Sequence, residues 1–131
     1  MQDSIFTKII KGEIPCHRVY EDDKTIAFLD IYPVQEGMTL VVTKNQVDNF
    51  EDLSEDDYTA LWATVKKVAQ KMRRVYPDKA KIAVQVEGLD VPHVHVKLFA
   101  INSGDEFRTK QDTSKDPDHA SLAAVAAKLA I

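Results

Sequence analysis

Cysteine, glycine and long apolar runs are all scarce in this 131-residue sequence, and each shortage narrows what the protein can be. The single cysteine, Cys16, has no partner for a disulfide within the chain, and we interpret it as a small structural residue rather than a nucleophile. The opening "MQDSIFTKIIKGEIP" contains no uninterrupted apolar segment, so we expect neither a signal peptide nor a membrane span. These features predict a cytoplasmic protein.

Surplus positive charge is missing as well. Lysine and arginine together number 17 against 21 aspartates and glutamates, which gives a net charge of −4. Nonspecific binding to DNA, RNA or an anionic membrane depends on excess lysine and arginine. We therefore expect no nucleic-acid polymer and no membrane as partner, and the composition favours a small molecule or another protein.

The first half of the chain predicts a short helix followed by three strands. No repeat or linker divides the sequence, so residues 1–131 are predicted to form a single domain. Residues 3–11 predict a short N-terminal helix with Asp3 or Ser4 as its cap and Gly12 at its end. Residues 17–30 predict a hairpin, and residues 38–44 predict a third strand.

The clearest periodic segment, residues 54–76, predicts a long amphipathic helix that covers one face of a sheet, with Ser54 as its cap. Two further strands are expected at 81–88 and 91–101, followed by a polar loop over 102–115. Asp116 as cap and Pro117 at the first helical position then predict an extra C-terminal helix. This order predicts an α+β domain with a largely antiparallel sheet of about five strands.

The stretch "VPHVHVKLF", residues 91–99, places nitrogen-bearing side chains at every second position. Side chains alternate between the two faces of a strand, with a rise of about 3.3 Å per residue. His93, His95 and Lys97 are therefore expected on one face, and the apolar residues between them on the other, against the core.

Three interpretations of the polar face remain open. Two alternate histidines can supply part of a metal site, but Lys97 is a cation, and His17 and His119 have no ligand-like spacing to the pair. The histidines can instead be structural. Neutral imidazole can also attack phosphorus and pass the phosphoryl group to water, with a nearby cation stabilising phosphate oxygens.

The same stretch resembles the signature of the histidine triad (HIT) superfamily, His-φ-His-φ-His-φ-φ with φ apolar, with Lys97 in place of the third histidine. "SIFTKIIKGEIPCHRVYEDDKTIAFLDIYPVQEGMTLVVTK" is similar to the N-terminal half of bacterial members. The resemblance covers residues 1–101 and leaves 102–131 unmatched. It implies a five-stranded antiparallel sheet with one long helix, a homodimer whose sheets join, no cofactor, and a pocket for a purine nucleoside monophosphate.

Position by position, the resemblance implies that His95 is the nucleophile and forms a nucleotidyl-histidine, while His93 orients it. Asp30 matches the carboxylate that binds the ribose hydroxyls, although from sequence alone it is equally well a turn-initiating aspartate. The residues that match the apolar wall around the base are Ile5, Phe6, Ile9, Phe28, Ile31 and Leu40.

Several phosphate-contacting positions depart from the family pattern. Besides Lys97, Met38 replaces a pocket histidine, and the shortened loop "EGLDVP" places Asp90 where a phosphate-contacting residue often lies. Ser4, Thr7 and Gln46 stand where some members have two cysteines and a histidine that bind structural zinc, so we expect no metal.

These features predict a HIT-like nucleotide hydrolase or nucleotidyltransferase that acts on nucleoside 5′-phosphate derivatives, of the phosphoramidate or dinucleoside polyphosphate type. The nucleotidyltransferase branch of the superfamily has glutamine at the third position, so loss of that histidine does not exclude catalysis. Lys97 could bind the α-phosphate firmly. The alternative is a purine nucleotide-binding protein with weak or no catalysis, because Lys97 fails to protonate the leaving group or holds product too tightly.

Overall fold

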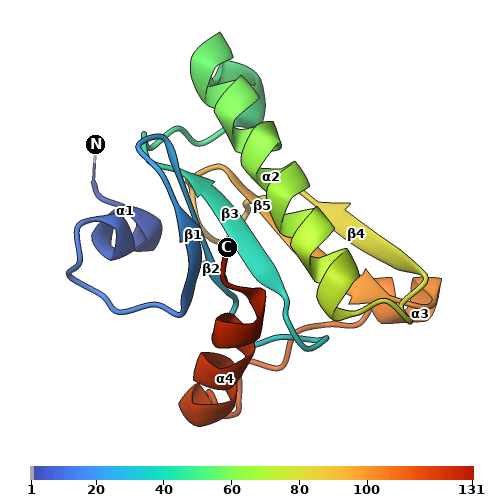
Figure 1. Cartoon of the computed structure of the whole chain (residues 1–131). Coiled ribbons are helices and arrows are strands. Elements are labelled where there is room, and N and C mark those ends of the chain that lie inside the picture. The colour runs from blue at the N-terminus through green and yellow to red at the C-terminus, as the bar shows by residue number, and fades with distance from the viewer. Residues whose placement is uncertain (1) are drawn as a thin grey trace.

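Five strands form one antiparallel sheet in the computed structural model, which describes residues 2–131 (Figure 1). Along the sheet, the strands are ordered β1 (Arg18–Glu21), β2 (Thr25–Leu29), β3 (Thr39–Thr43), β5 (His95–Ile101) and β4 (Lys81–Gln85). The first three strands are neighbours in sequence, and β5 lies between β3 and β4. The histidine stretch therefore enters the sheet beside its central strand.

Two helices cover one face of the sheet, and a third lies near β1 (Figure 1). The long helix α2 (Glu55–Val75) crosses β2, β3 and β5, and α4 (His119–Leu129) packs on β1, β2 and α2. The remaining helical elements are α1 (Ile5–Ile10), the 3-10 turn η1 (Phe50–Asp52) and the short α3 (Gly104–Phe107). Among residues 2–131, no helix combines the length and apolar character needed to cross a membrane.

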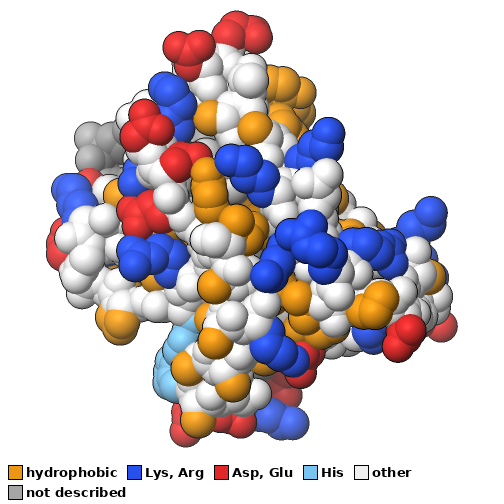
Figure 2. Space-filling model, viewed as in Figure 1, with side chains coloured by type: hydrophobic (Ala, Val, Ile, Leu, Met, Phe, Trp, Pro, Cys, Tyr) orange, Lys and Arg blue, Asp and Glu red, His pale blue; other side chains and the backbone are white. Residues whose placement is uncertain are grey.

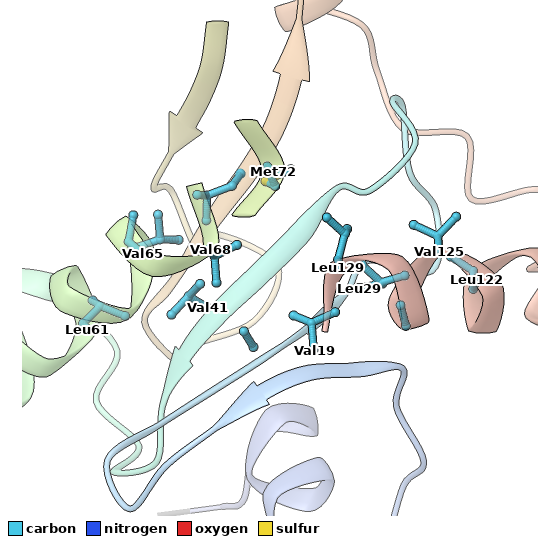
Figure 3. Packing of buried hydrophobic residues seen from close by; sticks show 14 of the residues in the cluster. Val19, Leu29, Val41, Leu61, Val65, Val68, Met72, Leu122, Val125 and Leu129 are labelled. Atoms are coloured by element: carbon cyan, nitrogen blue, oxygen red, sulfur yellow. The ribbon is translucent and has the colours of Figure 1, made fainter. Parts of the chain in front are cut away.

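The main core lies between the sheet and the pair α2 and α4 (Figure 3). Alternate strand residues face it, including Leu29, Val41 and Val96, and α4 contributes apolar side chains such as Val125. Val94, Val96 and Leu98 are buried in this core, as the alternation in the sequence predicted. Basic side chains gather over α2 on its solvated side, where Lys67 and Arg73 are exposed (Figure 2).

The opposite face of the sheet carries a second, smaller cluster beneath α1. Phe6 packs there against Phe28, with ring centroids 5.6 Å apart, and the other buried members are Ile26, Leu40 and Val42. In the register of the sheet, Val42 lies opposite His95 and Leu40 lies opposite Lys97. The predicted polar face therefore shares its side of the sheet with α1.

The expected α+β fold with a five-stranded antiparallel sheet and one long helix is confirmed. Ser4 caps α1 and Ser54 caps α2, each accepting a hydrogen bond from a backbone N–H of the first turn. The predicted loop 102–115 was wrong in part, because α3 forms there with Ser103 as its cap. The expected C-terminal helix begins later than predicted: Asp118, rather than Asp116, is the cap and accepts from the Ser121 N–H at 3.1 Å.

Both strands of the second pair are shorter than predicted. Strand β4 ends at Gln85, and β5 begins at His95 rather than at residue 91. The backbone N–H of His93 donates to the Val91 carbonyl, and that of Val94 donates to the Val47 carbonyl, so neither continues the sheet ladder. His93 therefore precedes the strand, although its ring still contacts Phe6 as that of His95 does.

Candidate active site

His95 is held at the first position of β5 by a hydrogen bond to its own chain. Its Nδ1 lies 2.7 Å from the His93 carbonyl oxygen. Because a carbonyl oxygen only accepts, Nδ1 carries the hydrogen, and the neutral ring has its lone pair on Nε2. The ring also packs edge-on against Phe6, with centroids 4.9 Å apart, and the residue is only 9% exposed. This tautomer is the one that a nucleophile attacking through Nε2 requires.

His93 is completely buried and its ring is fixed at both nitrogens. Nε2 lies 2.6 Å from the Thr43 carbonyl oxygen, so it donates there, and the neutral ring then accepts at Nδ1 from the Ser4 hydroxyl at 2.7 Å. Burial lowers the pKa of His93 below its ordinary value, and the Thr43 carbonyl only partly opposes this shift. Burial therefore favours the neutral form of His93, and the backbone carbonyl of the same residue binds His95.

Ser4, Thr7 and Gln46 form a polar cluster around the His93 ring. Thr7 Oγ1 donates to Gln46 Oε1 at 2.6 Å, and the Ser4 backbone N–H donates to the same oxygen at 2.8 Å. Thr7 Oγ1 also lies 3.4 Å from His93 Nδ1. The positions that the family resemblance equates with zinc ligands are therefore adjacent in space and are joined here by hydrogen bonds.

Lys97 and Asp30 meet at the other end of the polar face. Lys97 Nζ lies 3.5 Å from Asp30 Oδ2, and the two side chains are 19% and 11% exposed. Asp30 Oδ1 accepts from the Tyr32 backbone N–H at 2.9 Å, which is the contact of a turn-initiating aspartate. Gln111 lies between the two charges: its Nε2 donates to Asp30 Oδ2 at 2.8 Å, and its Oε1 accepts from Lys97 at 2.7 Å.

The residues expected to form an apolar wall fall into two groups. Phe6, Ile9, Phe28 and Leu40 belong to the cluster beneath α1. Ile5 is 48% exposed and Ile31 is 37% exposed. The structure therefore packs four of the six together and leaves two accessible at the surface.

A small hollow of about 160 Å³ lies beside His95. Its wall comes from the turn before η1, from the loop after β4 and from the start of β5; the lining residues are Asp48, Asn49, Phe50, Glu51, Val86, Glu87, Gly88, Val94 and His95. Asp90 is exposed on the same loop and is not among these residues. The residues of this loop that line the hollow beside the candidate nucleophile are Val86, Glu87 and Gly88.

Other polar features of the surface lie apart from the histidine stretch. His17 and His119 contact each other, with Nε2 and Nδ1 2.9 Å apart, beside α4, where pale-blue side chains are visible in Figure 2. A larger hollow of about 600 Å³ runs along β1 and the end of the chain. Both basic residues of its lining, Arg18 and Lys44, are already paired with Glu21. Neither feature adds a group to the candidate site.

Three residues of the site were not predicted from the sequence: Gln111, and Asn49 and Gly88 of the hollow. Gln111 is a single polar residue in a polar segment, and no periodicity or motif distinguishes it from its neighbours. Gly88 has a positive φ of 68°, and a Cβ there would lie 3.9 Å from His95 Cε1. The glycine in "EGLDVP" was therefore the usable signal for a close approach to His95.

Comparison with known proteins places this site in a family. The HIT domain model matches residues 11–103. An uncharacterized HIT-like protein of Methanocaldococcus jannaschii is 38% identical over 117 residues, which cover 87% of this chain and 91% of that protein. The adenosine 5′-monophosphoramidase of Schizosaccharomyces pombe is 36% identical over 99 residues, covering 72% of this chain and 71% of that protein.

Solved structures agree with the sequence comparison. The crystal structure of a HIT-like protein from Bartonella henselae superposes with a TM-score of 0.81 at 30% identity, covering 97% of this chain and 94% of that one. The matched residues include β1 to β5 and α2, which together carry the His93–His95–Lys97 stretch. The chain is therefore a member of the histidine triad (HIT) superfamily, with lysine at the third position of the motif.

Proposed function

We propose that this protein is a nucleotide hydrolase or nucleotidyltransferase that acts on nucleoside 5′-phosphate derivatives through a covalent intermediate on His95. The observation that carries the proposal is the bond from His95 Nδ1 to the His93 carbonyl. It leaves the Nε2 lone pair free for attack, and the ring borders the hollow beside Gly88. A named adenosine 5′-monophosphoramidase among the relatives supports a phosphoramidate as one substrate type.

The chemistry divides into two displacements at the α-phosphorus. In the first, His95 Nε2 forms a bond to phosphorus as the bond to the leaving group breaks, and the leaving group departs with that electron pair and takes up a proton. In the second, water or another acceptor forms a new bond to phosphorus, its proton is lost, and the electrons of the phosphorus–nitrogen bond return to Nε2. The His93 carbonyl stabilises the imidazolium-like ring by accepting from Nδ1 throughout.

Asp30 and the apolar cluster are assigned to the nucleoside. A carboxylate that accepts two hydroxyl groups suits the vicinal diol of ribose. The base is assigned to the apolar side of the sheet, which the buried Phe6, Phe28 and Leu40 support from beneath. Ile5 and Ile31 are exposed and available to extend that surface. Lys97 is assigned to the phosphate, which requires its ammonium to leave Gln111 and Asp30 and turn toward His95.

The test is mass spectrometry of protein quenched during turnover of adenosine phosphoramidate. We expect a nucleotidyl adduct on His95 that is absent in His95→Ala. The matched control is His119→Ala, which removes an exposed histidine outside the site. Absence of turnover and of an adduct across a panel of phosphoramidates and dinucleoside polyphosphates would overturn the catalytic proposal.

A second candidate function is nucleotide binding with little catalysis. The observation that favours it is that Lys97 is held by Gln111 at 2.7 Å, away from a role in protonating a leaving group. It predicts a thermal shift with AMP that survives His95→Ala and weakens in Asp30→Ala, without hydrolysis. Lys97→His separates the two functions, because a rise in turnover would identify the lysine as the limit on chemistry.

A homodimer joined through its sheets is part of the same proposal. Strand β4 is an outer strand of the sheet; Val84 within it is 40% exposed, and Val86 just after it is 38% exposed. At the opposite edge, the Ile131 N–H donates to the Val19 carbonyl of β1, so the end of the chain already occupies part of that edge. These features favour β4 as the contact. Light scattering of the wild type and of Val84→Lys tests it, and a monomeric wild type would overturn it.

A further inference from the structure

Gln111 lies in the segment between α3 and α4, beyond the residues 11–103 that the family model matches. Its carboxamide nevertheless contacts four groups at the Asp30 end of the site, the longest contact being that of Nε2 with Met38 Sδ at 4.0 Å. Nε2 donates to Asp30 Oδ2 at 2.8 Å and to the Tyr32 carbonyl at 2.9 Å, while Oε1 accepts from Lys97 at 2.7 Å. Both donor hydrogens and the oxygen are therefore used within the candidate site.

Gln111 carries the link between Asp30 and Lys97. The direct separation of the ammonium and the carboxylate is 3.5 Å, whereas charge-assisted hydrogen bonds are typically about 2.7–2.9 Å. Both contacts of the carboxamide with these two charges fall in that shorter range. Each charged group therefore makes a shorter contact with Gln111 than with the other charge.

The arrangement leaves Asp30 with the acceptor capacity that a diol needs. A carboxylate offers about four acceptor positions, two on each oxygen. The Tyr32 N–H takes one on Oδ1 and the Gln111 amide takes one on Oδ2. When Lys97 turns toward the phosphate, one position remains on each oxygen, so two neighbouring hydroxyls can bind while Gln111 stays in place.

We infer that Gln111 is a positioning residue of the sugar subsite, which fixes the Asp30 carboxylate so that each oxygen receives one hydroxyl of a ribose diol. The inference rests on the proposed assignment of Asp30 to the nucleoside sugar. It adds a specificity determinant from the C-terminal segment, and it makes discrimination between ribose and 2′-deoxyribose depend on a residue outside the family motif.

Calorimetric binding of AMP and of 2′-deoxy-AMP tests this inference. Gln111→Met keeps the approximate length of the side chain and removes both donors. We expect this variant to bind AMP about tenfold more weakly, which is the effect of losing one hydrogen bond to a charged group. Its affinity for 2′-deoxy-AMP should change far less. Thr113→Ala alters an exposed residue of the same segment and is the matched control, with both affinities unchanged. Gln111→Asn, on a shorter stem, replaces Gln111→Met if that variant does not unfold cooperatively.

The preference for ribose is the readout that separates positioning from a purely structural role. If Gln111 has only a structural role, Gln111→Met lowers stability but leaves the ratio of the two dissociation constants at its wild-type value. That result overturns the inference. Tighter AMP binding in Gln111→Met also overturns it, because Gln111 then obstructs the subsite. If the wild type binds neither nucleotide, the proposed function itself fails; if it binds AMP and the ratio does not change in the variant, only the role of Gln111 fails.

Discussion

Ser4 and His93 are 89 residues apart in the chain, yet Ser4 Oγ lies 2.7 Å from His93 Nδ1. The contact joins the cap of α1 to the residue whose carbonyl oxygen holds His95 Nδ1. A short polar path therefore runs from the N-terminal helix to the proposed nucleophile. The Thr43 carbonyl fixes the tautomer of His93, because Nε2 must donate to it, and the Ser4 hydroxyl is then the donor to Nδ1.

Ser4→Ala is expected to reduce both stability and turnover. It leaves His93 Nδ1 buried without its donor, which costs about 1–3 kcal/mol in the free energy of unfolding. Turnover should fall about tenfold, because Ser4 orients the reactive group only indirectly, through His93. That value is at the lower end of the loss seen when such a supporting residue is removed. Urea denaturation and steady-state kinetics with a phosphoramidate measure the two effects.

Ser54→Ala is the matched control, because Ser54 caps α2 as Ser4 caps α1. It should lower the free energy of unfolding by about 1 kcal/mol through the lost cap and leave turnover unchanged. Equal losses of turnover in both variants would mean that Ser4 acts only as a helix cap.

The cluster around His93 should accept zinc when its oxygen ligands are exchanged for sulfur and nitrogen. Hydrogen bonds of 2.6 to 3.4 Å link the side chains of Ser4, Thr7, Gln46 and His93. The four side chains are therefore clustered, as the four ligands of a tetrahedral zinc site must be. The combined substitution Ser4→Cys, Thr7→Cys and Gln46→His should bind one zinc per chain after dialysis and raise the melting temperature. Elemental analysis measures the metal. The same substitution with His93→Ala should bind markedly less, and equal binding would contradict the expected ligand set.

Regular elements could be predicted from the sequence because their signals are local. The periodicity of 54–76 and the cap Ser54 predicted α2 almost to the residue, and alternation predicted that Val96 and Leu98 face the core. Strand β5 was extended too far at its start because His93 and Val94 continue the alternation of His95 and Val96. What ends the strand is a backbone bond from Val94 to Val47, which no local pattern encodes.

The polar partners of the site were harder to predict. Lys97 was expected to face a phosphate, and its contact with Gln111 depends on how a segment beyond the residues 11–103 of the family model folds back over the sheet. The C-terminal helix illustrates the same limit. Its apolar residues could be identified in the sequence, but the face of the sheet on which the helix packs could not. Leu122 and Leu129 pack into the main core beside α2.

Stability should fall as the pH drops below about 6.5, because His93 is buried as a neutral ring. In the unfolded chain its pKa is about 6.5, and burial lowers the pKa in the folded protein. Between the two values the unfolded state binds more protons, so the free energy of unfolding rises with pH. The contribution is complete above pH 6.5 and is lost progressively toward the lower, folded pKa. Urea midpoints measured from pH 5 to 8 test this slope.

The slope should diminish in His93→Gln, which has no titrating ring. The lowered pKa values of carboxylates such as Glu21 and Glu36 act in a separate range, below their ordinary values near 4.5. A slope of the same size in His93→Gln would assign the pH dependence to other groups.

Gly37→Ala is expected to destabilise the protein more than Gly12→Ala. Both glycines have a positive φ, +87° and +80°, so an added Cβ strains each backbone by about 1–2 kcal/mol. At Gly37 the Cβ would also lie 2.8 Å from Tyr76 Oη and 3.2 Å from Leu129 Cδ1, whereas at Gly12 it meets nothing within 4 Å.

The difference between the two alanine variants therefore measures the close contacts at Gly37, of which those with Tyr76 are the shortest. That tyrosine donates to Glu36 at 2.7 Å, and Glu36 also pairs with Lys128 of α4 at 2.9 Å. Displacing the ring would disturb the junction of α2, α4 and the turn before β3, and we expect an additional loss of about 1–3 kcal/mol. Urea denaturation of both variants measures it. Equal losses of stability in the two variants would show that the Tyr76 ring moves aside at no cost. Tyr76→Phe removes only the hydroxyl, and adding it to Gly37→Ala should recover part of the lost stability if the clash is real. If there is no clash, the added Tyr76→Phe should recover nothing.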